Sequence, residues 1–420
     1  MSTGADLRGE TPARRRHVDR AVRLWLGLPG SADIETPRLP PVLERRFLRL
    51  EEYERPRRDA WGCWDHTFSE NYLDGMLEVP ELDHWLVERR AELSRRATLE
   101  PLWPDGKRFA ACLTHDVDAL SARSTPRQVL RHATAGLGRG SVARDPLRFI
   151  RPPIRAGRAL RGGLARSPST RGTIELSTEL EANYEASASY FFIVPPNGVG
   201  SRYDCAYALE DSCTFRGSRT SVTEVIRALA ADGFDVGLHG SYYSATRPGV
   251  LTAERATFER ATGISPTTTR QHFLHWEITQ TPQLQAAAGF TADSTLGFNR
   301  TVGFRASTAL PFRQFDVAAD ESLELLEVPL VVEDSALLGP IAVRSGLDHA
   351  RERVQKLVDT TREVGGAMTF LFHPDRLLGA EWLALYEWSL RYLAESGAWL
   401  TSLAELDRWW TARERKLLDG

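Results

Sequence analysis

Cysteine, lysine and long apolar runs are scarce in this sequence of 420 residues. No run of 18 apolar residues occurs, which predicts that no helix crosses a membrane, and the N-terminal stretch has no apolar run of signal-peptide length. We therefore expect a cytoplasmic location. The four cysteines have no CxxC spacing and give little support for a disulfide or a cysteine-ligated metal: Cys63, Cys112, Cys205 and Cys213.

A strong excess of one charge is also lacking, since 53 basic residues face 56 acidic ones and the formal net charge is -3. This balance indicates no polyanionic partner overall, and we expect no nucleic acid. Hydrophobic residues make up 42% and charged residues 26%, as in ordinary globular proteins, which excludes a long disordered or coiled-coil chain. Only three basic residues are lysines, an arginine preference that we attribute to coding bias: Lys107, Lys356 and Lys416.

Short apolar runs alternate with helix-like stretches from about residue 109 onward. Stretches such as SVTEVIRALAADG and GLDHARERVQKLVDTTREVGG have apolar residues at helical spacing and end in glycine, which commonly caps a helix. This alternation is typical of a parallel α/β fold, and seven or eight units favour a (β/α)7-8 barrel over an open sheet. The predicted strands are 109–114, 187–194, 235–239, 267–272, 290–294, 325–332, 368–372 and 399–402.

Residues 1–100 differ from the rest of the chain. They combine a proline-rich stretch at 37–41 with amphipathic segments that carry several Trp and Leu. Large apolar side chains need burial to offset the entropy lost on ordering, so we expect a helical N-terminal region that packs on the barrel. The barrel domain itself is expected to span 101–410.

An arginine-rich insertion at 121–171 interrupts the barrel domain, with twelve Arg and a single acidic residue, Asp145. One interpretation is an exposed insertion with no partner. Another is an interfacial arm that binds anionic lipid or a phosphate-linked substrate and makes the protein membrane-associated. Nucleic acid is the least favoured partner, because Phe149 is the only Phe, Tyr or Trp there for base stacking.

The first predicted strand ends in LTHDVDAL, where alternation places Asp116 and Asp118 on one face and His115 on the other. Catalytic groups collect at the C-terminal ends of parallel strands. Two carboxylates that face each other repel unless a cation or a shared proton relieves them, so the pair indicates a metal site or an acid–base role. The alternative is a helix N-cap beside a surface carboxylate.

Other predicted strands also end in residues that suit catalysis or metal binding. Strand ends open on one side of a barrel, so we expect these side chains to meet there. Asp334, farther along, is interpreted instead as a cap or a surface charge. The strand-end residues are His239 in GFDVGLH, His373 in TFLFH, and Arg270 and His272 in TTTRQHFLHW.

These segments together resemble the polysaccharide deacetylase (NodB homology) family, carbohydrate esterase family 4, over about residues 109–406. The resemblance implies a distorted (β/α) barrel that hydrolyses acetyl groups of sugars with a divalent metal ion, and Zn²⁺ is the ion we expect. The family motif T-F-D-D-G is similar to THDVD, which implies that Asp116 is the catalytic base. Val117 stands where the family has its metal-binding Asp, so the resemblance gives that role to Asp118.

The second motif, H-[ST]-x-x-H, is similar to HGSYY, with His239 as the first metal-binding His and Tyr243 in place of the second. A neutral phenol is a poor zinc ligand, so a third ligand is needed, and His272 is the candidate because its strand end opens on the same face. The third motif implies that Arg270 pairs with the catalytic Asp. The fifth, L-H-P, is similar to FHP and makes His373 the general acid.

Substrate contacts are expected from two further positions. Backbone N–H groups from Gly240 to Tyr242 are expected to hold the oxyanion, with Tyr242 as a substrate-binding residue. Arg305, in a GFR turn, is a candidate for binding an anionic group of the substrate.

These residues point to a metal-dependent hydrolase that removes an acetyl group from an N-acetyl amino sugar in glycan or glycoconjugate biosynthesis. The Tyr243 substitution leaves open a metal-independent C–N hydrolase on the same barrel. A third interpretation is a non-catalytic glycan-binding or scaffold protein. Such a protein has no chemical need for the complete set of Asp116, Asp118, His239, Arg270 and His373.

Overall fold

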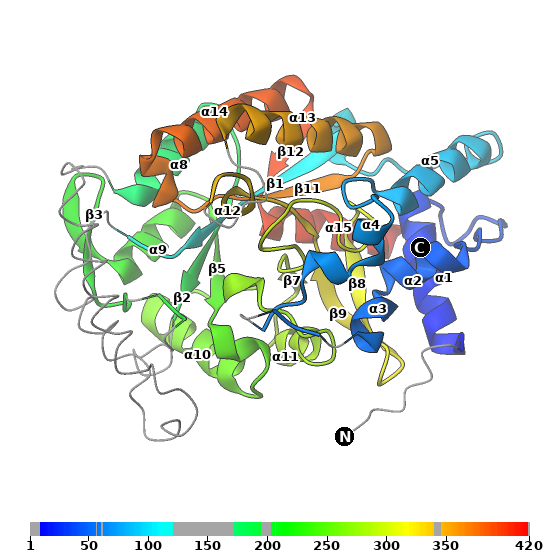
Figure 1. The fold of residues 1–420 in the computed structure, drawn as a ribbon, viewed down its shortest axis with the longest axis horizontal. Coiled ribbons are helices and arrows are strands. Elements are labelled where there is room, and N and C mark those ends of the chain that lie inside the picture. Colours follow the sequence, from blue (N-terminus) through cyan, green and yellow to red (C-terminus); the bar gives the residue numbers. More distant parts are fainter. Residues whose placement is uncertain are drawn as a thin grey trace.

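The computed structural model describes residues 9–55, 57–59, 62–120, 172–194, 203–205, 207–339 and 346–418. Within these residues, the central feature is one curled sheet with helices packed around it (Figure 1). The arginine-rich insertion at 121–171 lies outside the described residues. No helix in the described part of the chain is long and apolar enough to span a bilayer.

The sheet runs in the spatial order β10, β11, β1, β2, β5, β6, β7, β9, β8, and β12 lies beside β1. Neighbouring strands are parallel except β8 and β9, which form an antiparallel hairpin. The α/β class predicted from the alternating runs is therefore confirmed. The strands of this sheet are β1 Phe109–Val117, β2 Ser189–Ile193, β5 Asp235–Gly240, β6 Thr268–Gln271, β7 Ala292–Asp293, β8 Phe312–Asp316, β9 Glu321–Glu327, β10 Leu330–Glu333, β11 Ala367–Leu371 and β12 Ala398–Thr401. A separate hairpin consists of β3 Ser212–Phe215 and β4 Ser218–Ser221.

A contact across the inner side of the sheet reveals its curl. Arg270 on β6 and Thr114 on β1 are separated by three strand steps, about 14 Å in a flat sheet. Their side chains nevertheless form a hydrogen bond of 3.0 Å from Nη2 to Oγ1. Within the described residues the ladder does not close, because β10 and β8 remain its edges. The barrel is therefore distorted and open on one side.

The segment that follows β7 bonds to β10 on this open side. Leu330 donates its N–H to Leu296 O at 3.0 Å, and Gly303 donates its N–H to Val331 O at 3.0 Å. Gly303 has φ +138°, and a Cβ on it would lie 2.3 Å from Leu77 O. Only glycine therefore allows this segment and the N-terminal region to approach so closely.

Helices form the outer layer, and α13 and α14 lie side by side along one flank (Figure 1). Helix α9 begins with a capping box between Ser221 and Glu224, and α13 ends at Gly365 with φ +71°, as the sequence pattern predicts. The helices are α8 Thr173–Ala182, α9 Val222–Ala231, α10 Val250–Thr262, α11 Thr281–Ala287, α12 Asp334–Leu338, α13 Leu347–Val364, α14 Ala380–Glu395 and α15 Leu403–Leu418. Short 3-10 turns follow three strand ends: η5 Tyr242–Ala245, η6 His272–Leu274 and η7 Arg376–Leu378.

Strand β1 separates two hydrophobic cores. Ala111 and Leu113 face outward, into the core between the sheet and the helices. Ala110 and Cys112 face inward, into a second core inside the barrel. The same alternation carries the inward face on to Asp116 at the end of the strand, as predicted from the sequence.

The N-terminal helices contribute to the inner core and gather at one side of the molecule, close to the C-terminal end of α15 (Figure 1). Trp25 is completely buried and donates its indole N–H to Pro311 O at 2.9 Å. Asp83 is also buried and accepts hydrogen bonds from Thr308 Oγ1 and Ala309 N. The elements are α1 Pro12–Leu26, α2 Pro41–Phe47, α3 Leu50–Glu54, η1 His66–Phe68, α4 Glu70–Leu73, α5 Glu81–Leu93 and η2 Pro104–Gly106.

Candidate metal centre and active site

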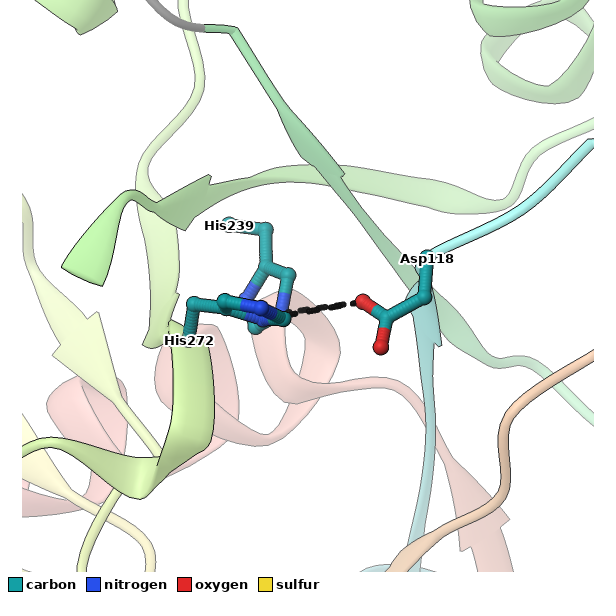
Figure 2. Close-up of side chains that lie close together, drawn as sticks. All are labelled: Asp118, His239 and His272. Atoms are coloured by element: carbon teal, nitrogen blue, oxygen red, sulfur yellow. Dashed lines mark hydrogen bonds and ion pairs between the residues drawn. The ribbon is translucent and has the colours of Figure 1, made fainter. Parts of the chain in front are cut away.

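Three side chains from three strand ends converge into a cluster that suits a metal ion. Asp118 follows β1, His239 lies in β5, and His272 begins the η6 turn after β6. One potential ligand atom of each residue lies within 4.8 Å of the other two. Figure 2 shows the two imidazoles and the carboxylate close together. The structure thus brings together the three residues that the sequence suggests as metal ligands.

Backbone carbonyls orient both imidazoles. His239 Nδ1 lies 2.8 Å from Arg270 O, and His272 Nε2 lies 2.9 Å from Tyr203 O. Each of these nitrogens donates a proton to its carbonyl, because a carbonyl oxygen only accepts. The remaining nitrogens, His239 Nε2 and His272 Nδ1, face each other at 3.0 Å. In neutral imidazoles both atoms carry lone pairs, which repel unless a cation or a proton lies between them.

Asp118 supplies the negative charge of the cluster. Its Oδ1 lies 3.6 Å from His239 Nε2 and 3.6 Å from His272 Nδ1. Burial raises the pKa of Asp118, but the imidazoles of His272, His239 and His373 outweigh burial and hold this pKa well below its usual range. Two imidazoles and one ionised carboxylate form a donor set that Zn²⁺ commonly takes in catalytic sites. The residues present therefore fit a divalent metal ion.

Asp116 lies beside this cluster. Its side chain is buried, with Oδ2 3.6 Å from His239 Nε2 and Oδ1 3.8 Å from Arg270 Nη1. Neither Oδ1 nor Arg270 Nη1 has a hydrogen-bond partner among the described residues. Buried polar atoms are rarely left unpaired, so these two atoms mark a place for water or a substrate group. Arg270 is held by its hydrogen bond to Thr114 and by the ring of Phe191, whose centroid is 5.3 Å away.

His373 is fixed by a residue that the sequence analysis misinterpreted. Asp334, expected to be a cap or a surface charge, is completely buried directly after β10. Its Oδ1 lies 2.8 Å from His373 Nδ1, and its Oδ2 accepts the backbone N–H of His373 at 2.9 Å. Burial lowers the pKa of His373, but Asp334 and then Asp118 raise it to about 10. The sequence offered one signal, an acidic residue at the end of a predicted strand.

The contact with Asp334 leaves Nε2 of His373 directed toward the cluster of Asp118, His239 and His272. This nitrogen lies 3.8 Å from Asp118 Oδ2, on the side away from Asp334. Because Asp334 accepts the Nδ1 proton, the Nε2 proton of the imidazolium form is the one available for transfer. The geometry therefore suits a group that protonates a leaving atom.

Arg305 is not part of this site, so the prediction that it binds an anionic substrate group is wrong. Its Nε and Nη2 donate to the two carboxylate oxygens of Glu52 at 2.9 and 2.7 Å, and its Nη1 donates to Gly297 O at 2.9 Å. Both charged side chains are almost fully buried. Every guanidinium nitrogen thus has a hydrogen bond, and the two bonds to Glu52 join the N-terminal region to the barrel.

Two of the backbone N–H groups expected to hold an oxyanion, those of Ser241 and Tyr242, are engaged elsewhere, which contradicts this role for them. Ser241 donates its N–H to Glu254 Oε2 at 3.1 Å, and Tyr242 donates its N–H to Asp204 Oδ1 at 2.7 Å. Both carboxylates hold the loop after β5 from outside the cluster. The N–H groups of Ser241 and Tyr242 are therefore not available to an oxyanion.

The two tyrosines of this loop point in different directions. The Tyr242 ring is buried between the rings of Tyr203 and His275, at centroid distances of 4.3 and 4.2 Å. Its role as a substrate-binding residue stays a prediction. The centroid of the Tyr243 ring lies 3.9 Å from the guanidinium of Arg247.

No family model matches this chain. No curated protein matches it in sequence. Solved structures that match it in fold include a putative polysaccharide deacetylase from Mycobacterium smegmatis (20% identity, TM-score 0.48, covering 76% of this chain and 96% of that one), Puue allantoinase (14%, 0.48, 76% and 95%) and a probable polysaccharide deacetylase from Pseudomonas aeruginosa PAO1 (15%, 0.47, 76% and 95%). Two of these three bear the name of the family that the sequence motifs resemble. Identities and TM-scores this low describe a broad likeness of fold and assign no activity.

Proposed function

We propose that this protein is a metal-dependent deacetylase that hydrolyses the acetyl group of an N-acetylated sugar. The observation that supports the proposal most strongly is the pair of imidazole nitrogens that face each other at 3.0 Å, with their ring N–H groups turned to backbone carbonyls. With the adjacent carboxylate of Asp118, this donor set fits Zn²⁺. A buried carboxylate and a protonated imidazole flank it, and amide hydrolysis needs two such proton-transfer groups.

A divalent ion held by Asp118, His239 and His272 would supply Lewis acidity to the acetyl carbonyl and to a water molecule. Asp116 is placed to accept the proton of the attacking water, because its Oδ1 is free of hydrogen bonds to the described residues. Arg270 Nη1 faces the same oxygen at 3.8 Å, so the guanidinium lies beside the carboxylate that receives this proton.

His373 is placed to donate the proton that the leaving amine nitrogen needs. Asp334 holds the imidazole by Nδ1 and by the backbone N–H, so Nε2 faces the site. A cation beside Asp118 opposes the rise in the pKa of His373, since it offsets the charge of that carboxylate. The imidazolium then becomes a better proton donor near neutral pH.

The proposed substrate is an N-acetyl amino sugar within a glycan or glycoconjugate. A cytoplasmic location and contact of residues 121–171 with anionic membranes remain predictions from the sequence. The alternative function is metal-independent C–N hydrolysis on the same barrel. In that alternative no metal ion lies between His239 and His272, so their facing nitrogens must share a proton.

Acetate release from N-acetylglucosamine and its oligomers tests the proposal. We expect release by zinc-loaded protein, loss of release after chelation, and a decrease of about 100-fold or more in Asp116→Asn. Asp348→Asn, at an exposed position on α13, is the matched control and should behave as wild type. Equal release after chelation would favour the metal-independent hydrolase. No release by any zinc-bound sample would contradict a deacetylase acting on these sugars.

A further inference from the structure

The backbone turn that follows His272 adopts an unfavourable conformation. Phe273 has φ +62° and Leu274 has φ +48°, so two successive residues with side chains occupy the left-handed region. Such residues persist there only when their surroundings hold them. Because His272 directly precedes this turn, whatever holds the turn also sets the direction of the His272 imidazole.

Two side chains hold the turn through one atom, the carbonyl oxygen of Phe273. Asn299 donates from Nδ2 at 2.7 Å, and Cys63 donates from Sγ at 3.4 Å. Asn299 lies in the segment after β7, whereas Cys63 belongs to the N-terminal region. A carbonyl oxygen has two lone pairs, so two donors from different directions fix the orientation of this peptide group.

Cys63 is built to act as a donor. Asp59 and Cys63 bond to each other twice, from Asp59 N to Cys63 O at 2.8 Å and from Cys63 N to Asp59 Oδ1 at 2.9 Å. These two hydrogen bonds hold Cys63, whose thiol is almost fully buried. Burial, followed by the charge of Asp59, raises the pKa of Cys63 to about 12, so the thiol keeps its proton.

The Phe273 side chain packs beside the same histidine. Phe273 is 37% exposed, and its ring meets the His272 ring edge-on at a centroid distance of 4.6 Å. A backbone hydrogen bond from His275 N to His272 O at 3.2 Å closes the turn, and the two side-chain hydrogen bonds to Phe273 O fix the orientation of its peptide group.

We propose that Cys63 and Asn299 are positioning residues for the metal centre. They hold the left-handed turn at Phe273 and thereby direct His272 Nδ1 toward the metal. The inference rests on the proposed metal-dependent function and deepens it, because it gives the N-terminal region a part in metal affinity.

Zinc affinity of the full-length protein, measured by competition with a chromophoric chelator, tests this without any assay of activity. Cys63→Ala and Asn299→Ala should each weaken zinc binding about 3-fold to 10-fold, and the double variant about 10-fold to 100-fold, the range typical of groups that orient metal ligands. Cys63→Ser keeps a donor and should stay within about threefold of wild type. Cys213→Ala removes a buried thiol from the β3–β4 hairpin and is the matched control, with unchanged affinity expected.

Phe273→Gly added to the double variant separates positioning from general damage, because glycine adopts the left-handed conformation without penalty. Recovery of most of the lost affinity supports the inference, and persistent weak binding in this triple variant overturns it. Binding by the double variant within about twofold of wild type overturns the inference alone. A wild-type protein that binds no zinc overturns the proposed function as well.

A single variant tests the same point where the double variant does not fold. Asn299→Asp keeps the volume of the side chain but sets a carboxylate against the carbonyl oxygen of Phe273. We expect zinc binding about 10-fold weaker than wild type. Unchanged affinity in this folded variant would equally overturn the inference.

Discussion

Asp334 binds His373 through both carboxylate oxygens. Its Oδ1 lies 2.8 Å from the ring Nδ1, and its Oδ2 accepts the backbone N–H of His373 at 2.9 Å. One carboxylate at the end of β10 thus fixes both the main chain and the ring of a histidine at the end of β11. The pair is almost fully buried, so removing one partner leaves the other without compensation.

In the metal-free protein, Asp334→Asn should lower the free energy of unfolding by about 3 kcal/mol at mildly acidic pH, where Asp334 is ionised and His373 is protonated. The fold raises the pKa of His373 from 6.5 to about 10. While Asp334 is ionised, its stabilising contact with His373 is fully present below pH 6.5 and is lost as the pH rises toward 10. In acid, below the usual carboxyl pKa of 3.8, protonation of Asp334 also removes it. Urea unfolding should show the gap between wild type and variant narrowing as the pH rises from 6.5 to 10. A gap that stays constant would contradict the ionised pair.

His272→Ala should weaken zinc binding by more than about 100-fold, beyond the effect typical of groups outside the ligand shell. Tyr243→Phe should bind zinc as wild type does, because the Tyr243 ring packs on the Arg247 guanidinium at 3.9 Å and a neutral phenol is a poor zinc ligand. Isothermal titration with Zn²⁺ measures both. Loss of zinc in Tyr243→Phe, with retention in His272→Ala, would reverse the assignment of the third ligand.

Arg270→Lys should separate catalysis from metal binding. The backbone oxygen of Arg270 still accepts from His239 Nδ1, so we expect zinc affinity within about twofold of wild type. The planar guanidinium is lost, and kcat for acetate release should fall about 100-fold. Arg260→Lys, at an exposed position on α10, is the control for both measurements. Equal losses in affinity and kcat would show that the side chain supports the metal centre itself.

Glu52→Gln should lower the free energy of unfolding by about 3 kcal/mol, because it leaves the buried guanidinium of Arg305 without its counter-charge. Glu88→Gln on α5 alters a side chain that is 70% exposed and should change stability by less than about 0.5 kcal/mol. Urea unfolding compares the two. A similar small loss in both variants would mean that the Glu52 contact adds little to the fold.

Sequence reasoning succeeded where the determining pattern is local. The alternation of β1 depends only on neighbouring residues, and it correctly placed Asp116 on the inward face and His115 on the outward face. His239 and His272 were expected to meet because parallel strands end on one side of a barrel. Because β5 and β6 are neighbours in the sheet, His239 Nε2 and His272 Nδ1 come to 3.0 Å from each other.

The contacts that the sequence did not reveal join residues far apart in the chain. Glu52 and Arg305 are separated by 253 positions, and no local pattern connects them. Asp334 was misinterpreted for the same reason, because its partner His373 lies on the neighbouring strand, 39 positions away. The contact between His272 and the backbone carbonyl of Tyr203 could not be predicted from the sequence either, because every residue carries such a carbonyl.

The N-terminal helices also affect whether a shorter fragment of the chain can fold on its own. A fragment that starts near residue 101 would lack Trp25 from the inner core and Glu52 from the pair with Arg305. It would also lose the thiol of Cys63 that touches the turn after His272. The side chains of the first hundred residues therefore complete the inner core of the sheet. We expect a fragment trimmed to the strand-bearing part to expose apolar surface and to aggregate.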